Sequence, residues 1–160
     1  MTIQRTLFGL SAAALASIAL AQAPATAPAS APAATPVGLW KTIDDATGKE
    51  KSLVRISESG GVLSGKIEKA LAPDAKPDAK CDECTDARKG QPIVGMTIIR
   101  NMKKADGDKA MWEGGDILDP NNGKIYRLRL IPSADSKKLT VHGYIGMPML
   151  GRSQTWQRVE

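Results

Sequence analysis

Residues 125–131 read Ile-Tyr-Arg-Leu-Arg-Leu-Ile, and residues 139–145 read Leu-Thr-Val-His-Gly-Tyr-Ile. In the first stretch Leu128 and Leu130 alternate with arginines, and in the second Leu139 and Val141 alternate with polar side chains. A period of two is typical of a strand that buries one face and exposes the other. These two stretches therefore predict neighbouring strands of an antiparallel sheet, the second of them running to residue 145.

The rest of the domain repeats this pattern in short pieces. Residues 52–57 and 62–67 alternate, residues 97–99 are β-branched, and glycine-rich or polar turns separate the pieces. Asn122-Gly123 is a strong hairpin signal, because glycine adopts a positive φ without strain. We expect an all-β fold: a small antiparallel up-and-down barrel of about eight strands, with a β-sandwich as the alternative.

The N-terminus has the features of an export signal. Arg5 gives a short positive region, residues 7–20 are apolar or small, and Ala19-Leu20-Ala21 matches the small-x-small cleavage pattern. The apolar run is too short for a spanning helix of about 20 residues. We therefore predict a signal peptide over 1–21, a periplasmic protein (alternatively a secreted one), and no transmembrane segment after cleavage.

Residues 22–36 are rich in Ala and Pro and carry no charge, which favours an extended linker. The single β-barrel domain is expected over 37–160, about 124 residues and enough for one core. The formal net charge of the chain is +5, but basic and acidic residues are interleaved without long basic runs. This pattern argues against a nucleic-acid partner.

Several motifs in series resemble one family of exported bacterial proteins, catalogued as domain of unknown function 2147 (DUF2147). The motifs are Gly38-Leu39-Trp40-Lys41-Thr42, Cys81-x-x-Cys84, Gly90-Gln91-Pro92-Ile93-Val94-Gly95, Trp112 to Pro120, Asn122-Gly123-Lys124-x-Tyr126, Leu139 to Gly146, and Leu150 to Arg158. The resemblance covers the chain from Val37 onward. It implies a lipocalin-like fold and export, and it implies no particular activity.

The opening Gly38-x-Trp40 also resembles the lipocalin signature. That resemblance implies that Trp40 packs at the closed end of the barrel against a basic side chain of the last strand. Arg152 and Arg158 are the two candidates for a cation–π contact there.

Cys81 and Cys84 lie in a long Pro-, Asp- and Lys-rich segment, 71–92. In an oxidising compartment two cysteines at this spacing are expected to form a disulfide. A redox dithiol and a metal site are the alternatives. The acidic residues Asp82 and Glu83 between the cysteines disfavour a low thiol pKa, and His142 is the one histidine of the chain.

The last strand suggests a ligand site. If Trp156 faces inward, Gln154 and Arg152 face the same way, and an amphipathic, cationic lumen would suit a small amphipathic or anionic ligand. Tyr126 and Trp112 complete the set of ligand-binding candidates. The alternative is a lumen filled by Leu128, Leu130, Val141 and Tyr126, with no pocket.

Two other chemistries have candidate residues. Glu113, Asp116, Asp119 and His142 are the plausible acid–base set for a hydrolytic enzyme, although Asp119 beside Pro120 is typical of a turn. Met147-Pro148-Met149, with Met96, Met102 and Met111, offers soft ligands for Cu(I); apolar packing at the barrel mouth is the alternative.

The sequence thus ranks three functions. The first is a non-enzymatic exported barrel that binds a small amphipathic or anionic ligand or an envelope component. The second is a structural or protein-interaction module of the envelope with a filled core, and the third is an enzyme or a copper protein. No cofactor, resident metal or catalytic residue is predicted.

Overall fold

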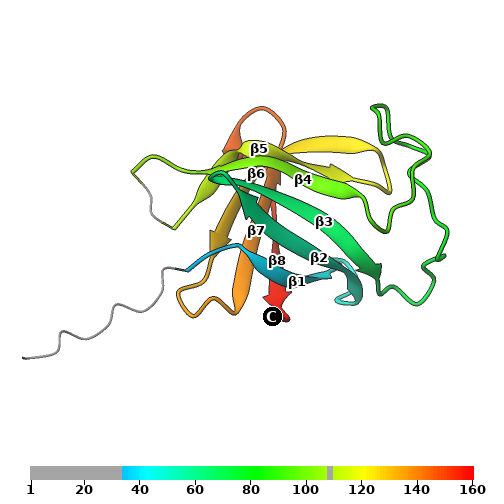
Figure 1. Cartoon of the computed structure of the whole chain (residues 1–160), viewed down its shortest axis with the longest axis horizontal. Coiled ribbons are helices and arrows are strands. Elements are labelled where there is room, and N and C mark those ends of the chain that lie inside the picture. The colour runs from blue at the N-terminus through cyan, green and yellow to red at the C-terminus, as the bar shows by residue number, and fades with distance from the viewer. Residues whose placement is uncertain (1–33, 108–109) are drawn as a thin grey trace, which may run out of the picture. The chain divides into compact units, whose positions relative to one another are not determined.

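The computed structural model describes residues 34–107 and 110–160, and it is a closed antiparallel β-barrel (Figure 1). The strands are β1 (Gly38–Ile43), β2 (Glu50–Ser59), β3 (Val62–Ala70), β4 (Thr97–Lys104), β5 (Trp112–Asp119), β6 (Lys124–Pro132), β7 (Lys138–Tyr144) and β8 (Arg152–Arg158), with a 3-10 turn η1 (Pro148–Leu150) before the last. Each strand pairs with the next in sequence. The predicted eight-stranded up-and-down barrel is confirmed. The predicted signal peptide and most of the linker lie outside the described residues.

The two stretches that indicated a sheet are β6 and β7. Leu130 pairs with Val141 and Leu128 with Gly143, so the predicted inward faces match. The second stretch was predicted one residue too long, since β7 ends at Tyr144 and the Ile145 side chain is 65% exposed. Beyond Tyr144 the chain turns away from the sheet, so alternation no longer decides which way a side chain points.

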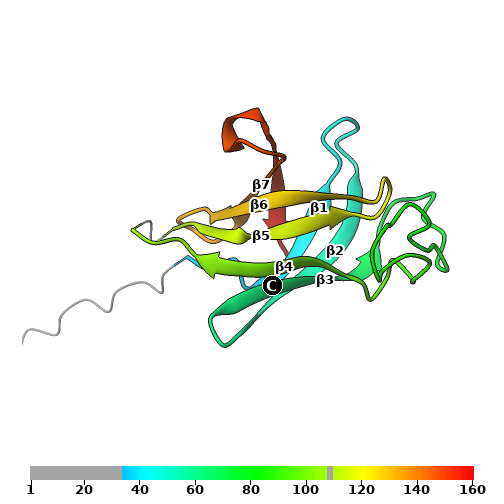
Figure 2. The ribbon, with the colours of Figure 1, turned by 90° about the horizontal axis from the view of Figure 1, so that it is seen from above.

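The barrel has two distinct ends, which Figure 2 shows from above. The connections 44–49, 71–96, 120–123 and 145–151 lie at one end, here called the loop end. The other end, here called the terminal end, holds the connections 60–61, 105–111 and 133–137 and both ends of the described domain. The Leu39 amide donates to the Glu160 carbonyl (2.9 Å) there. The longest connection, 71–96, therefore lies at the loop end.

The lumen is the hydrophobic core. Its inward positions carry large apolar side chains, all buried and all in one cluster: Trp40, Val54, Ile56, Leu63, Ile67, Ile99, Met102, Trp112, Leu128, Leu130, Leu139, Val141 and Trp156. Small barrels of about eight strands can be filled by side chains in this way. The filled-lumen alternative raised by the sequence describes this part of the barrel.

Two glycines of β5 lie where its backbone closely approaches β4. The register of β5 against β6 shifts between Trp112 and Gly115, and Gly114 there has a φ of 83°. A Cβ on Gly115 would stand 2.1 Å from the Arg100 carbonyl oxygen and 2.6 Å from Met102 Sδ. The Gly114-Gly115 pair therefore serves a bulge and a close backbone approach.

A search of residues 34–107 and 110–160 finds no helix with the length and apolar character needed to cross a membrane.

Candidate functional site

Arg158 closes the terminal end of the barrel. Its guanidinium carbon lies 4.2 Å from the centre of the Trp40 ring, and its Nη1 and Nη2 donate to the carbonyls of Val37 (2.8 Å) and Thr35 (2.7 Å). Burial lowers the pKa of Arg158 from its usual value. The predicted cation–π contact is confirmed, and of the two candidate arginines Arg158 makes it.

The residues just before β1 take part in this closure. Pro36 is buried, and its carbonyl accepts a hydrogen bond from Trp40 Nε1 (2.7 Å). A Cβ on Gly38 would stand 2.2 Å from Arg158 Nη1, so the glycine of the Gly-x-Trp motif makes room for the arginine. Packing contacts therefore begin at Thr35 and Pro36, two residues before the domain start expected from composition.

The three candidate ligand residues of β8 share the inward face but differ in environment. Trp156 is buried in the core, and its Nε1 donates to Gln154 Oε1 (3.3 Å). Arg152 lies at the loop end with 67% of its side chain exposed, and its Nε donates to Asp45 Oδ2 (2.6 Å). The strand thus runs from packed core to open surface.

The other two candidates separate along the barrel. Trp112 is buried beside the terminal end, where Lys104 Nζ lies 5.5 Å from its ring centre. Tyr126 is half-buried on the lumen side of β6, toward the loop end. The ligand site at these five positions stays a prediction.

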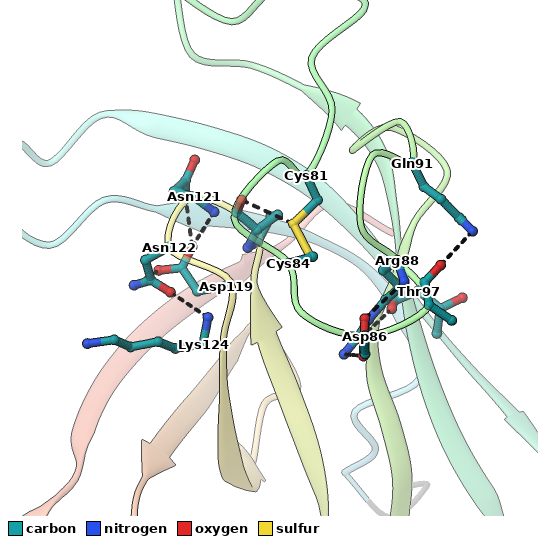
Figure 3. Close-up of a disulfide and its surroundings, with 12 residues drawn as sticks. Cys81, Cys84, Asp86, Arg88, Gln91, Thr97, Asp119, Asn121, Asn122 and Lys124 are labelled. Carbon is teal, nitrogen blue, oxygen red and sulfur yellow. Dashed lines mark hydrogen bonds and ion pairs between the residues drawn. A yellow bond between two sulfur atoms is a disulfide. The ribbon is translucent and has the colours of Figure 1, made fainter.

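The cysteines form the predicted disulfide, which Figure 3 shows against the turn between β5 and β6. Both cysteines are buried, and Cys81 Sγ lies 3.4 Å from the Pro120 carbonyl oxygen. In that turn Asp119 accepts from the Asn121 amide (3.0 Å) and from Asn122 Nδ2 (3.0 Å), so it is a turn residue, as expected. The disulfide staples a loop that packs on the hairpin.

This loop covers part of the outer face of β4 and β5. Ile99 and Ile117 are paired across β4 and β5, so their neighbours Ile98 and Leu118 point outward, yet both are buried. Arg88 is paired with Asp86 within the loop (2.6 Å). The loop is attached to β4 by a hydrogen bond from Arg88 Nη1 to the Thr97 carbonyl (3.1 Å) and by the ion pair of Asp86 with Arg100 (3.6 Å). The long segment 71–96 therefore extends the hydrophobic core beyond the lumen, onto the outer face of the sheet.

The acid–base candidates all lie in structural contacts. Glu113 pairs with Arg129 (3.0 Å) and Asp116 with Arg100 (3.4 Å). His142 is bonded through both ring nitrogens: Nδ1 to Ser153 Oγ (2.8 Å) and Nε2 to the Pro148 carbonyl oxygen (2.7 Å). A carbonyl only accepts, so Nε2 carries a proton.

The methionines do not gather at one place. Met96 and Met102 are buried in the core, and Met111 precedes β5 at the terminal end. Met147 and Met149 are exposed at the loop end, 58% and 82%. Within residues 34–107 and 110–160, no group of three or more His, Cys, Asp or Glu side chains is arranged to hold a metal ion.

The connection between β7 and β8 carries the most exposed apolar side chains described. Ile145 (65%) and Leu150 (71%) join the two methionines there. An open depression of about 500 Å³ is lined by Arg129, His142, Met147, Pro148 and Met149, outside the lumen. The segment 145–150, here called the apolar loop, is thus a surface feature of the loop end.

Sequence reasoning weighed two of these residues as copper ligands and missed the loop as a surface. The available signal was the run Ile-Gly-Met-Pro-Met-Leu over 145–150. Glycine and proline within it prevent the strand from continuing, so its large apolar residues cannot all follow β7 into the core.

Comparisons with known proteins agree with this architecture. The family model described as "Uncharacterized protein conserved in bacteria (DUF2147)" matches residues 38–158. The structure is similar to one titled "Protein HP1028 from the human pathogen Helicobacter pylori belongs to the lipocalin family", with a TM-score of 0.66, 19% identity, and coverage of 78% of this chain and 82% of that one. A search of curated proteins finds no match. At this identity the likeness shows the fold alone.

Proposed function

The chain belongs to the DUF2147 family of uncharacterised bacterial proteins and has a lipocalin-like barrel, and from this premise we propose that it is a non-enzymatic binding protein of the cell envelope that recognises its target with the surface of its loop end. One contrast carries the proposal. The lumen holds the packed core, whereas the apolar loop leaves four large side chains 58–82% exposed. Exposed apolar clusters of this kind mark interaction sites.

The non-enzymatic part of the proposal rests on how the acid–base candidates are used. Glu113 and Asp116 are neutralised by arginines on neighbouring strands, and the two ring nitrogens of His142 contact Ser153 of β8 and the Pro148 carbonyl of the connection after β7. Export to the periplasm is part of the proposal, supported by the predicted N-terminal signal and by the disulfide, which suits an oxidising compartment.

A small amphipathic or anionic ligand at the mouth of the lumen is the second candidate. It is favoured by Tyr126, Ile117 and Gln154, which are half-buried on the inward side toward the loop end. Such a ligand would lie above the core, near Arg152, and not within the barrel.

One experiment separates the two. The full chain is produced in a bacterial host, recovered from the periplasm and from the envelope fraction, and weighed intact by native mass spectrometry. We expect a mass that starts at Gln22, no retained small molecule, and an envelope-bound fraction that falls when Met149→Ser and Leu150→Ser are combined. The alternative outcome is a small molecule retained in stoichiometric amount. If it is lost in Gln154→Ala but kept in the loop variant, the binding site is the mouth of the lumen.

A further inference from the structure

One hydrogen bond joins the backbone of the apolar loop to the barrel, and two others close the turn itself. The Pro148 carbonyl accepts from His142 Nε2 (2.7 Å) and from the Gly151 amide (3.2 Å), and the Leu150 amide donates to the Met147 carbonyl (3.1 Å). A Cβ on Gly151 would stand 2.6 Å from the Gly143 carbonyl oxygen, so the chain lies directly on β7. The loop is thus fixed to the barrel at Pro148 and Gly151, while its four large apolar side chains are 58–82% exposed.

Unpaired positive charge lies beside the loop. Arg127 is exposed on the outer face of β6, in register with Tyr144, the residue that precedes Ile145, and it has no ion pair among the described residues. Ile125, which is 41% exposed, lies on the same face two residues before Arg127 and closer to the loop end. The surface thus combines apolar side chains with a cation.

The acids near Arg127 are paired with other arginines. Asp116, which lies opposite Arg127 in the register of β5 and β6, is paired with Arg100 (3.4 Å). Asp45 is paired with Arg152 (2.6 Å) and Glu113 with Arg129 (3.0 Å), so these four charges offset one another. The chain as a whole has a formal net charge of +5. A target with negative charge is therefore favoured over a neutral or positive one.

The shape favours a lipid surface over a folded partner. The apolar loop projects from the barrel as a narrow tip, seen in orange and red in Figure 2. A stable protein interface buries about 800 Å² and 20–30 residues on each side, far more than a six-residue tip offers. Methionine, leucine and isoleucine at a convex tip suit the boundary between lipid headgroups and acyl chains.

Building on the proposed function, we propose that the target is an anionic lipid surface. Ile145, Met147, Met149 and Leu150 enter the layer of acyl chains, and Arg127 lies at the level of the negatively charged headgroups. Apolar insertion supplies most of the affinity, and the cation adds a preference for anionic lipid that weakens with salt.

The test uses the full chain, purified after export, in flotation with vesicles. One vesicle set contains phosphatidylethanolamine and phosphatidylglycerol, and the other contains phosphatidylcholine alone. Combined Met149→Ser and Leu150→Ser removes two inserted side chains, and we expect binding at least about tenfold weaker. Arg127→Gln should weaken binding to the anionic vesicles about fivefold and leave the phosphatidylcholine vesicles unaffected.

Val159→Ser is the matched control, because Val159 is 51% exposed but lies at the terminal end, and its variant should bind as the native chain does. Met149→Trp gives a second readout, a blue shift of tryptophan emission on anionic vesicles. The inference is overturned if the native protein does not float with the vesicles, or if the loop variant floats as well as the native protein does. If vesicles fail but the loop variant still loses its envelope fraction, surface recognition stands and lipid is the wrong target.

Discussion

Arg158 connects three parts of the chain from one position at the end of β8. It stacks over Trp40 of β1, donates to the carbonyls of Thr35 and Val37 before that strand, and donates through Nε to the Ser136 carbonyl between β6 and β7. Only a planar guanidinium presents donors in these several directions at once. We expect Arg158→Lys to lower the free energy of unfolding by about 2 kcal/mol, measured by urea denaturation.

Arg152→Lys is the control on the same strand. Arg152 makes one exposed ion pair with Asp45, and such pairs contribute at most about 1 kcal/mol. If Arg158→Lys and Arg152→Lys lower the free energy of unfolding equally, the contacts of Arg158 at Trp40 contribute no more to stability than an exposed ion pair.

Gly123 has a requirement of its own. Its φ is 68°, and a Cβ there would stand 1.8 Å from the Glu83 carbonyl oxygen in the disulfide loop. We expect Gly123→Ala to cost about 3 kcal/mol or more in thermal or urea unfolding, because strain at positive φ adds to a clash between two backbones.

Gly60 provides the comparison, since its φ is 58° and nothing lies within 4 Å of its Cβ position. Gly60→Ala should cost only the conformational part, about 1 kcal/mol. The difference between the variants measures how firmly the disulfide loop sits on the β5–β6 turn, and no difference would mean that the loop moves aside freely.

At the scale of elements, the loop 71–96 is fastened by charge as well as by its disulfide. The hydrogen bond and ion pair from Arg88 lower the pKa of Asp86 from 3.8 to about 2. A carboxylate with a lowered pKa in the folded state stabilises the protein above its unfolded pKa, and that stability is lost as the pH falls toward the folded value. The window for Asp86 is thus from about pH 5 down to about pH 2.

Asp86→Asn should remove this dependence. The side chain is 30% exposed, so solvent screening reduces the effect, and we expect the native chain to lose about 1 kcal/mol more than the variant across the window. Asp44, Glu68 and Asp135 also have lowered pKa values, but both proteins share them. Parallel curves of unfolding free energy against pH would contradict the assigned role of Arg88.

The strands that bury one face could be predicted from the sequence. Leu128, Leu130, Leu139 and Val141 alternate with polar residues, and their faces follow from the period of two. Ile98 and Leu118 are buried on the outer face because a loop distant in sequence covers them. No local pattern contains that information, so the long segment could be predicted to be stapled but not placed.

For the molecule as a whole, the sequence predicted the barrel and its disulfide, and the resemblance to the lipocalin signature narrowed the closing contact to Arg152 or Arg158, but the lumen was left undecided. Whether Trp156 borders a pocket or fills a core depends on which side chains from the opposite strands pack against it. The five ligand candidates share inward positions, yet Trp112 and Trp156 are core residues while Arg152 reaches solvent. The sequence therefore predicted that these side chains point inward, but it did not predict how far along the barrel each one lies.

The boundary of the folded unit can be tested by truncation. Removing residues 1–33 leaves every contact of the described domain, whereas removing 1–36 also deletes the carbonyls that accept from Arg158 (Thr35) and Trp40 (Pro36). The second truncation also uncovers the site of buried Pro36. We expect the chain starting at Ala34 to unfold at the urea concentration of the mature protein, and the chain starting at Val37 to lose about 3 kcal/mol. Equal midpoints for the two truncations would place the boundary at Val37, where composition alone put it.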